Sequence, residues 1–420
     1  MLLAQKSEIR GLPKKQYSML LEMCRYANSL ANVAEYHIRH YRSRTGAYLS
    51  YEKNCRISKY NLNYKMLQAQ VAQQTLKRQD KKHQAYFGLL KAKKDGSFSG
   101  PVRPPHFRKK GGYDNLYISG KYVIIRGEHI ALPMSRAFRE KHGGEEILIR
   151  IPPVVHGKKI HEVQIIPERD GSFIDAVFVY EEPENAKLKL HKNNILSLDP
   201  GLDNFVTGVC TDGTTFIVDG RRIKSINQWY NKLRAEKQSK LPKGVYWSRF
   251  LTRITRRREH RIRDFIHKAA NEVIRQAREH NCGTIIIGAN RGLKQNICLG
   301  AATNQNFVQI PHARFRAVLE EKCSRAGIRL VCQEESYTSK ASALDRDPIP
   351  TFDPLQQQIC TFSGRRISRG LYRSKDGTLL NADVNGALNI ARKSKQDGSI
   401  PKCARLCRGV LDTPARIRIV

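Results

Sequence analysis

The feature that most constrains the fold of this 420-residue chain is the stretch ILSLDPGLDNF, residues 195–205. Four mostly apolar residues lead into Asp199, and a Pro-Gly pair then breaks the pattern. This order predicts a short buried β-strand that presents the Asp199 carboxylate at its end. Strand patterns at residues 206–210 and 215–218 flank a Thr-Asp-Gly turn, which indicates a hairpin. The stretch therefore predicts a β-meander whose first strand carries an acidic residue.

The charge balance restricts the class of partner. The chain has 75 Lys and Arg residues against 38 Asp and Glu residues, a formal net charge of +37. Such an excess requires an acidic partner, and nucleic acid is the polyanion that fits best. No window of about eighteen apolar residues offers a membrane span, and the N-terminal apolar run is too short for a signal peptide. We therefore expect a cytoplasmic protein, associated with the nucleoid when bound, with no membrane partner.

The ten cysteines do not form a metal-binding pattern, because none of them belongs to a CxxC pair. Isolated cysteines in an intracellular chain are mostly buried small apolar residues. We expect no disulfides and no zinc.

The N-terminal half alternates between strand and helix patterns. Residues 1–12 and 110–192 carry short strand patterns separated by turn residues, which predict a small β-barrel or sandwich. Residues 13–109 insert two helical patterns and a linker rich in Gly, Pro and Ser. The second helical pattern, residues 63–93, presents a basic face. Beside the +37 charge we favour phosphate contacts over simple solvation for Lys77, Arg78, Lys81 and Lys82.

The C-terminal half contains a long basic helix and a βαβ unit. Residues 248–280 predict a helix whose apolar stripe is surrounded by arginines, which is typical of an anion-facing helix. A strand at 284–287, a helix at 307–326 and a strand at 329–334 predict two parallel neighbouring strands. A last helix is expected at 382–393. The arginines expected to bind nucleic acid are Arg253, Arg256, Arg257, Arg258 and Arg261.

Carboxylates at the ends of these elements are candidates for a metal-dependent nuclease. A meander with an acid on its first strand opens ribonuclease-H-like folds, in which carboxylates converge on Mg²⁺ or Mn²⁺. Asp199 ends the first strand. Asp383 lies in the first turn of the last helix, where Asn381 or Asp383 could simply cap the helix, and the sequence supports capping and metal binding equally.

A third acid is not supplied where the fourth strand ends, because that position is Gly288. The neighbouring parallel strand ends in Glu334 and Glu335, and the tips of parallel strands lie side by side. One of these glutamates can reach the open space above Gly288, but both cannot, because successive residues point to opposite faces. The alternative is that both are solvated charges at a strand end.

Five segments together resemble the TnpB family of transposon-encoded RNA-guided endonucleases, which is related to type V CRISPR nucleases and to Fanzor proteins. The resemblance covers residues 193–393. The segments are LDPGLDNF with its TDG turn, RRREHRIRDFIHK, NQNFVQIPHARF, EESYTSKAS and RGLYRSKDGTLLNADVNGALNIARK.

The resemblance implies a two-lobed protein. Its parts would be an α/β RuvC-like, RNase H-like nuclease domain at 193–340 and 379–393, and an N-terminal wedge-like β-barrel with a helical recognition insert. Asp199 and Asp383 match two of the family's metal-binding aspartates. The usual glutamate is missing at Gly288, and some members resemble this chain in carrying it before the Thr-Ser dipeptide. Glu335 matches that position, with Glu334 as the fallback.

The implied cofactors are Mg²⁺ or Mn²⁺ and a guide RNA, and the implied partner is target DNA. The site would cut after the guide pairs with DNA next to a short adjacent motif. Many members carry paired CxxC motifs in the region that corresponds to residues 341–378. Here that region holds only Cys360, so it is expected to be a basic nucleic-acid-binding insert without zinc. Its contact residues would be Arg365, Arg366 and Arg369, with Lys340 placed to contact the scissile strand.

Two other functions remain open at this stage. One is a nuclease-dead, RNA-guided repressor, supported by the missing acid at Gly288. The other is a guide-independent resolvase or transposase of the same fold. The oligomeric state, monomer or dimer, is also open. The tail, residues 394–420, has few order signals beyond RIRIV and is compatible with disorder.

Overall fold

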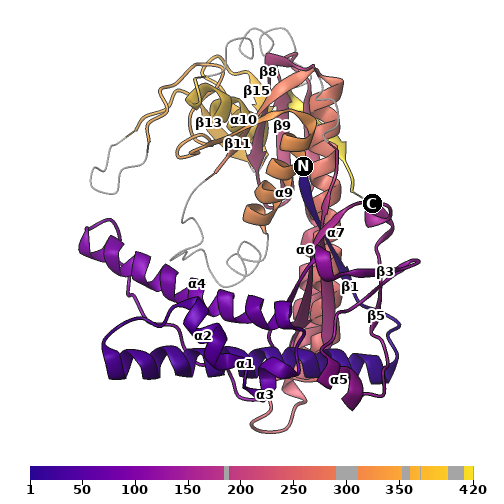
Figure 1. The fold of residues 1–420 in the computed structure, drawn as a ribbon. Coiled ribbons are helices and arrows are strands. Elements are labelled where there is room, and N and C mark those ends of the chain that lie inside the picture. Colours follow the sequence, from indigo (N-terminus) through magenta and orange to yellow (C-terminus); the bar gives the residue numbers. More distant parts are fainter. Residues whose placement is uncertain (184–188, 290–310, 352–359, 369, 396–410, 420) are drawn as a thin grey trace. The chain divides into compact units, whose positions relative to one another are not determined.

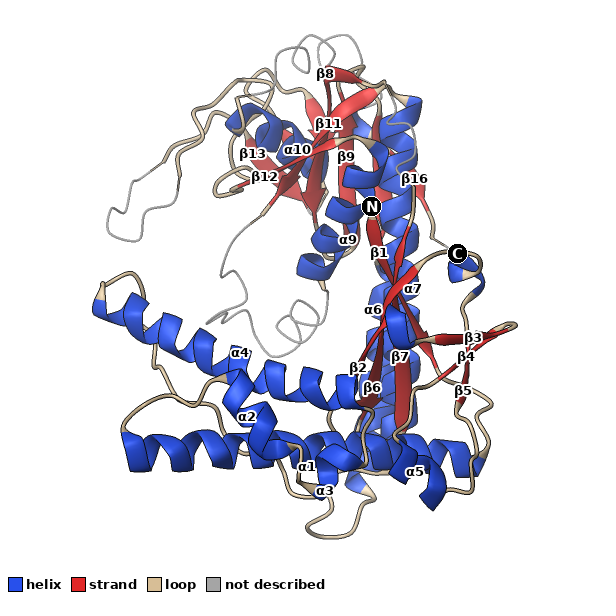
Figure 2. Cartoon of the chain, viewed as in Figure 1, coloured by secondary structure: helices blue, strands red, loops and turns tan. Residues whose placement is uncertain are grey.

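The computed structural model describes all residues except 184–188, 290–310, 352–359, 369, 396–410 and 420 (Figures 1 and 2). The chain forms two compact units, Met1–Pro183 and Glu184–Val420. The sequence placed this boundary between residues 192 and 193. None of the described helices combines the length and the apolar character that a membrane span requires.

The first unit contains long helices whose apolar positions recur every three or four residues. The helix expected from residue 63 to 93 is interrupted, which corrects the prediction. Leu67 lies between two helices, and the Gln68 side chain caps the second by accepting from the backbone N–H groups of Gln70 (2.7 Å) and Val71 (3.3 Å). The helices of this unit are α1 (Lys14–Thr45), α2 (Tyr51–Ser58), α3 (Leu62–Lys65), α4 (Ala69–Lys94) and α5 (Arg136–Lys141).

The strands of the first unit form two antiparallel sheets. Their orders are β1-β7-β6-β2 and β3-β4-β5. Closure of these strands into a barrel stays a prediction. The strands are β1 (Leu2–Glu8), β2 (Leu116–Ser119), β3 (Ile124–Arg126), β4 (His129–Ala131), β5 (Leu148–Arg150), β6 (Ile160–Glu168) and β7 (Phe173–Glu181).

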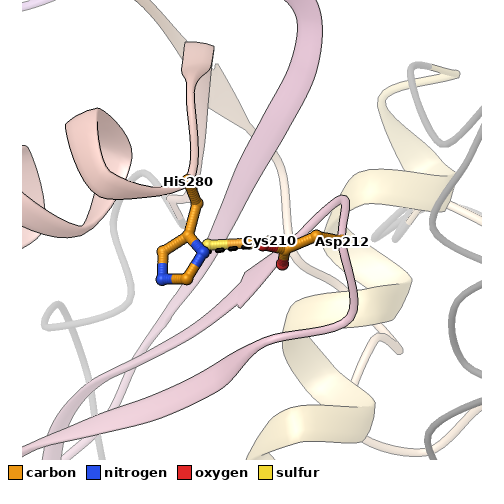
Figure 3. Close-up of side chains that lie close together, drawn as sticks. All are labelled: Cys210, Asp212 and His280. Carbon is orange, nitrogen blue, oxygen red and sulfur yellow. Dashed lines mark hydrogen bonds and ion pairs between the residues drawn. The ribbon is translucent and has the colours of Figure 1, made fainter.

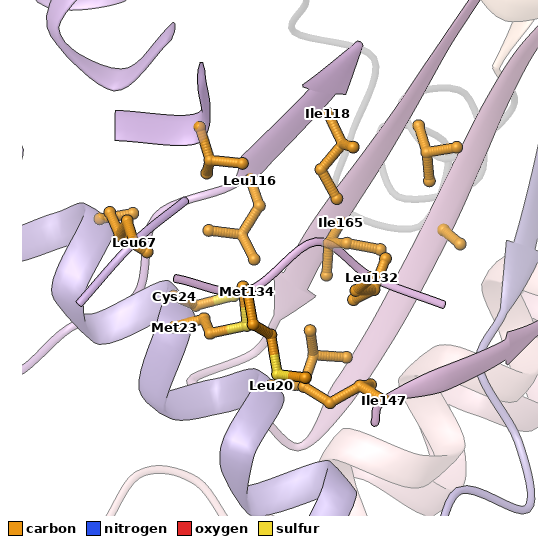
Figure 4. Close-up of a cluster of buried hydrophobic side chains, with 14 of the residues drawn as sticks. Leu20, Met23, Cys24, Leu67, Leu116, Ile118, Leu132, Met134, Ile147 and Ile165 are labelled. Atoms are coloured by element: carbon orange, nitrogen blue, oxygen red, sulfur yellow. The ribbon is translucent and has the colours of Figure 1, made fainter. Parts of the chain in front are cut away.

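One apolar core joins these sheets to the helices. Leu20 and Met23 of α1 pack with Leu116 and Ile118 of β2 and with Ile165 of β6 (Figure 4). All five side chains are fully buried. The helical insert is thus held by the same core as the sheets of its unit.

The second unit is built on a six-stranded mixed sheet of order β12-β11-β8-β9-β10-β16. The central strand β8 pairs in parallel with β11 and antiparallel with β9, and β11 pairs in parallel with β12 as the βαβ pattern predicted. The strands are β8 (His191–Pro200), β9 (Asn204–Cys210), β10 (Thr215–Asp219), β11 (Cys282–Gly288), β12 (Arg329–Gln333) and β16 (Ala415–Ile417).

The two faces of this sheet are covered by different helices. Leu196 and Leu198 of β8 pack in the core that α6, α7 and α9 cover, whereas Ile195 faces α10. This alternation follows from the two-residue period of a strand. The helices are α6 (Arg221–Ser239), α7 (Arg249–Glu279), α9 (His312–Ala326) and α10 (Ala382–Lys393).

Strand β16 lies in the part of the tail, RIRIV and the residue before it, where the sequence showed an order signal. Its residues pair in parallel with β10, from Phe216 opposite Ala415 to Val218 opposite Ile417. The segment RIRIV therefore includes an edge strand of the central sheet.

The insert at 341–378 contributes to a small antiparallel sheet of order β13-β14-β15. Asp347 is buried and accepts hydrogen bonds from the backbone N–H groups of Ser342 (2.8 Å) and Ser363 (3.1 Å). Asp345 accepts from the backbone N–H of Lys375 at 2.8 Å. Carboxylates therefore tie the loops of this insert together. Its strands are β13 (Arg365–Ser368), β14 (Leu371–Arg373) and β15 (Leu379–Asn381).

Candidate active site

Asp199 lies at the end of β8 on the face that α10 covers. Two residues earlier on the same face, the Ser197 hydroxyl donates a 2.6 Å hydrogen bond to the carbonyl oxygen of Ala387 in α10. The helix approaches this closely because the adjacent residue is Gly386. A Cβ atom at Gly386 would collide with the Asp199 carboxylate. The absence of a side chain at Gly386 therefore creates the space in which Asp199 lies.

Glu335 occupies the space above Gly288, as the strand-neighbour argument predicted. A Cβ atom at Gly288 would collide with the Glu335 carboxylate and would lie 2.8 Å from Cδ1 of Ile390. The backbone after Glu335 forms a turn, in which the Thr338 hydroxyl donates to the Glu335 carbonyl oxygen at 2.8 Å. This turn fixes the point at which the Glu335 side chain leaves the backbone.

Glu334 has a different environment from its neighbour. Its carboxylate pairs with the buried ammonium group of Lys393 and accepts a 2.6 Å hydrogen bond from the backbone N–H of Ser336. Burial alone would raise the pKa of Glu334, but the hydrogen bonds from Lys393 and Ser336 hold it below its ordinary value. Glu334 is thus a partner of α10, which favours Glu335 over the fallback as the site acid.

Asp383 does not cap α10, which answers the question that the sequence left open. The Asn381 side chain caps α10 by accepting from the backbone N–H groups of Asp383 (3.0 Å) and Val384 (3.3 Å). The Asp383 carboxylate instead accepts a 2.5 Å hydrogen bond from the Asn204 side-chain amide. A guanidinium nitrogen of Arg366 lies 3.9 Å from the other oxygen of Asp383.

The electrostatics of Asp199 reflect its burial and the two neighbouring carboxylates. Burial raises the pKa of Asp199 well above its ordinary value, and the charges of Glu335 and Asp383 raise it further. Burial raises the pKa of Glu335 to about 7, with Arg316 opposing this shift. Neighbouring carboxylates in a desolvated place are costly unless a cation joins them.

The donor set fits a hard divalent cation. Carboxylate oxygens are the ligands that Mg²⁺ and Mn²⁺ prefer, and Asp199, Glu335 and Asp383 supply them from β8, the end of β12 and α10.

Several residues that support the site were not predicted. The Asn385 side chain donates to the carbonyl oxygen of Ala341 (2.8 Å) and accepts from the backbone N–H of Ala343 (2.9 Å). The Asn389 side chain donates to the carbonyl oxygens of Thr338 (2.8 Å) and Ala341 (2.7 Å). Both asparagines are fully buried. Their spacing of four residues on an otherwise apolar helix face is the signal that could have revealed them.

The basic residues predicted on α4 divide into two groups. Lys77 and Lys81 are exposed. Arg78 is half-buried, with its guanidinium 3.3 Å from Asp114 and 4.1 Å from the ring centre of Tyr117. Lys82 is half-buried, and this burial lowers its pKa. The structure therefore offers Lys77 and Lys81 for contacts with phosphate, whereas Arg78 supports the fold of its unit.

The arginines of α7 also divide. Arg256 is buried, so its guanidinium does not lie on the predicted surface. Arg258 is half-buried and donates to the Asn227 side chain at 2.8 Å. The three that remain are exposed and lie four residues apart, on one stripe of the helix. They are Arg253, Arg257 and Arg261.

This stripe includes an aromatic side chain. The guanidinium carbons of Arg257 and Arg261 lie 5.8 and 5.6 Å from a ring centre of Trp229 in α6. The indole is 37% exposed, so an aromatic surface lies between two cations. Arginines beside an exposed ring are typical of surfaces that hold nucleic acid.

The remaining predicted contacts lie near the acids or outside the described residues. Arg365 and Arg366 are exposed on β13, and Lys340 is exposed after the turn that follows Glu335. Arg365 is paired across the sheet with Arg373, which is also exposed. Like charges directly opposite one another destabilise a sheet, which favours an anionic partner at this face. Arg369 lies outside the described residues.

Two family models match the second half of the chain. The OrfB_IS605 model, described as "probable transposase", matches residues 177–294. The model for the TNB domain of Cas12f1-like proteins matches residues 312–390. The carboxylates described above lie within these two matches. Asp199 is in the first, and Glu335 and Asp383 are in the second.

A viral relative shares part of the sequence. "TnpB-like protein ORF457" of Acidianus two-tailed virus is 24% identical over 213 residues, which cover 48% of this chain and 42% of the viral protein. The chain thus matches less than half the length of this relative.

Solved structures share the fold over most of the chain. Cas12f1 in its sgRNA–target DNA complex superposes with a TM-score of 0.52 at 13% identity, covering 89% of this chain and 81% of that one. The mini-RNA-guided endonuclease CRISPR-Cas_phi3 gives a TM-score of 0.51 at 11% identity, covering 94% and 92%. This likeness confirms the fold class predicted from the sequence. The two family models and the viral relative support a TnpB-type protein.

Proposed function

We propose that this protein is an RNA-guided DNA endonuclease whose cutting site consists of Asp199, Glu335 and Asp383. The observation that supports this proposal most strongly is the position of Glu335. A glycine leaves the usual strand end empty, and the carboxylate from the next strand fills that space beside Asp199. A site that had lost its acid would have no need of this replacement.

The side chains of the site would have three roles: holding the metal ions, orienting Asp383 and binding the phosphate. Asp199 and Asp383 would hold the metal ions from the two sides of the β8–α10 contact, and Glu335 would complete the set from above Gly288. Asn204 would keep the Asp383 carboxylate oriented, and Arg366 would bind the phosphate next to Asp383. When bound, Mg²⁺ or Mn²⁺ supplies an activated water and stabilises charge on the leaving oxygen.

The basic surfaces would hold the guide RNA and the target DNA. Arg253, Arg257 and Arg261 with Trp229 form a stripe that can track a backbone and stack against a base. Sequence specificity would come from base pairing with the guide, and the protein would recognise the heteroduplex by its backbone and shape. This division agrees with a net charge of +37.

The direct test is a cleavage assay with the protein purified together with its guide RNA. A plasmid library with randomised sequence next to the target is incubated with the complex in Mg²⁺, in chelator, and with an unrelated guide. We expect cutting of both strands only in Mg²⁺ with the matching guide.

Each alternative function gives a different result. Cutting by protein freed of RNA would show a guide-independent resolvase or transposase. Tight binding directed by the guide, without cutting in Mg²⁺ or Mn²⁺, would show a nuclease-dead repressor. Either result would refute the proposed function.

A further inference from the structure

A second cluster of metal-ligating side chains lies away from the carboxylates. Donor atoms of Cys210, Asp212 and His280 all lie within 4.8 Å of one another, and Figure 3 shows the three side chains converging. Cys210 ends β9, Asp212 lies in the turn to β10, and His280 follows the last residue of α7. The β9–β10 turn and the end of α7, which are distant in sequence, thus direct donors to one point.

The cluster is at the other end of the strands from the candidate active site. Cys210 pairs with Leu196 of β8, three residues before Asp199, which is about 10 Å along the strand. Strand β11 begins here, at Cys282, and reaches the active site only at Gly288. The cluster is therefore separate from the nuclease site.

A fourth donor is adjacent. The Cys282 thiol donates a 3.4 Å hydrogen bond to the carbonyl oxygen of His280, and both Cys282 and Cys210 are fully buried. His280 and Asp212 are partly exposed, with a 2.6 Å distance between Nδ1 of His280 and an oxygen of Asp212. Two thiols, one imidazole and one carboxylate form the mixed sulfur, nitrogen and oxygen set that zinc accepts in tetrahedral sites.

We propose that Cys210, Asp212 and His280 bind a structural zinc ion, with Cys282 as the fourth donor. The ion would replace the proton shared by Asp212 and His280 and the thiol proton of Cys210. It would join the β9–β10 hairpin to the end of α7 and the start of β11. Strands β9, β10 and β11 belong to the central sheet, and α7 packs on it. The ion would therefore stabilise the second unit without touching substrate.

Binding would depend on pH. Zinc binds a thiolate and a neutral imidazole, so its binding releases protons from the thiol and the imidazole. We expect affinity for zinc to rise with pH. The apo protein would keep its fold through the apolar core around β8 and α7.

The test is the metal content of the full-length protein, purified without a metal column or chelator. We expect about one equivalent of zinc per chain in the wild type. In protein reconstituted with Co²⁺ we expect tetrahedral ligand-field bands and a thiolate-to-cobalt charge-transfer band. Absence of both the bound metal and the charge-transfer band would overturn the proposal.

Matched variants locate the ion. Asp212 and Asp376 both accept from a Thr backbone N–H in an Asp-Gly-Thr turn, at 2.9 and 3.0 Å. Asp212→Ala should weaken zinc binding by roughly tenfold or more, whereas Asp376→Ala, which loses the same turn hydrogen bond, should not. Because Asp212 lies on a surface turn, this variant is expected to fold.

Cysteine variants complete the test. Cys210→Ala should lose the metal and the charge-transfer band, and Cys323→Ala, another buried cysteine of the same core, should keep both. Full metal content in Cys210→Ala and Asp212→Ala would place the ion elsewhere and refute the site. A disulfide between Cys210 and Cys282, detected as two missing thiols in denatured protein, would also refute it.

Discussion

Two glycines decide where the carboxylates of the candidate active site can lie. Gly386 lies in the middle of a helix, where glycine costs roughly 1 kcal/mol relative to alanine. Its place is explained by Asp199, whose carboxylate fills the volume that a Cβ atom would occupy. In the same way, the Glu335 carboxylate fills the volume that a Cβ atom at Gly288 would occupy. At both positions the absence of a side chain leaves room for a carboxylate from another element of the fold.

The first prediction concerns Gly386→Ala. We expect cleavage to fall by at least about a hundredfold, because the new methyl group displaces Asp199 and a misplaced group costs about that much. Thermal stability should change little, since the gain in helix propensity offsets the local collision.

The control is Gly88→Ala in α4, another helical glycine, whose added Cβ atom would meet no heavy atom within 4 Å. It should leave cleavage unchanged. Equal activity of Gly386→Ala and wild type would show that the Asp199 position does not matter.

At the scale of elements, α10 organises the site. One helix supplies Asp383, the space for Asp199, and the amides of Asn385 and Asn389 that hold the segment after Glu335. The sequence predicted this helix and Asp383, because its apolar period and its acid are local. It did not predict the roles of the asparagines, because their partners are backbone groups of a distant loop.

The insert between residues 341 and 378 depends on buried carboxylates. We expect Asp347→Ala to lower the free energy of unfolding by about 2–3 kcal/mol, because three hydrogen bonds to a buried charge are lost. Hydrogen exchange of the β13–β15 amides should become faster. Asp264→Ala, an exposed site on α7, serves as the control and should leave these amides protected. Unchanged exchange in Asp347→Ala would contradict this role.

The contact between α1 and α4 should depend on pH. Glu35 is buried, which alone would raise its pKa, but hydrogen bonds from His83, Arg39 and Gln79 lower the pKa to about 2. Because the folded pKa lies below the ordinary value of 4.5, the stabilisation is complete above pH 4.5. It is lost as the pH falls toward 2.

Glu35→Gln should therefore be less stable than wild type at pH 7, by about 3 kcal/mol. The difference should shrink as the pH falls from 5 toward 2, as measured by urea unfolding. Glu140→Gln, at an exposed ion pair on α5, is the control. A difference that does not change with pH would show that the charge of Glu35 is not what stabilises the contact.

At the scale of the whole molecule, the charge and the fold agree with nucleic-acid binding. The sequence predicted the β9–β10 hairpin and the parallel β11–β12 pair, because turn residues and strand–helix–strand order are local signals. It did not predict that β8 lies between β11 and β9, and from the residues alone it left Glu334 and Glu335 open. It marked RIRIV as an order signal but did not predict the parallel pairing of β16 with β10, because the partner strand is distant in sequence. It also placed Arg256 on the surface, since a count of arginines cannot show which side of a helix is covered.

Binding should therefore depend on salt through particular arginines. Arg257→Ala and Arg261→Ala should each weaken nucleic-acid binding and reduce the slope of log K against log salt by about one. The control is Arg275→Ala on the same helix, where the guanidinium already pairs with Glu272 and Glu279. Equal slopes for all three variants would argue against the α7 stripe as a contact surface.

The most direct test of the central claim compares Glu335→Gln with Glu334→Gln in the guided cleavage assay. We expect Glu335→Gln to bind guide and target as the wild type does but no longer to cut in Mg²⁺. Glu334→Gln should still cut, because Glu334 serves as the partner of Lys393. Cutting by Glu335→Gln at the wild-type rate, or loss of cutting only in Glu334→Gln, would contradict the assignment of the third acid.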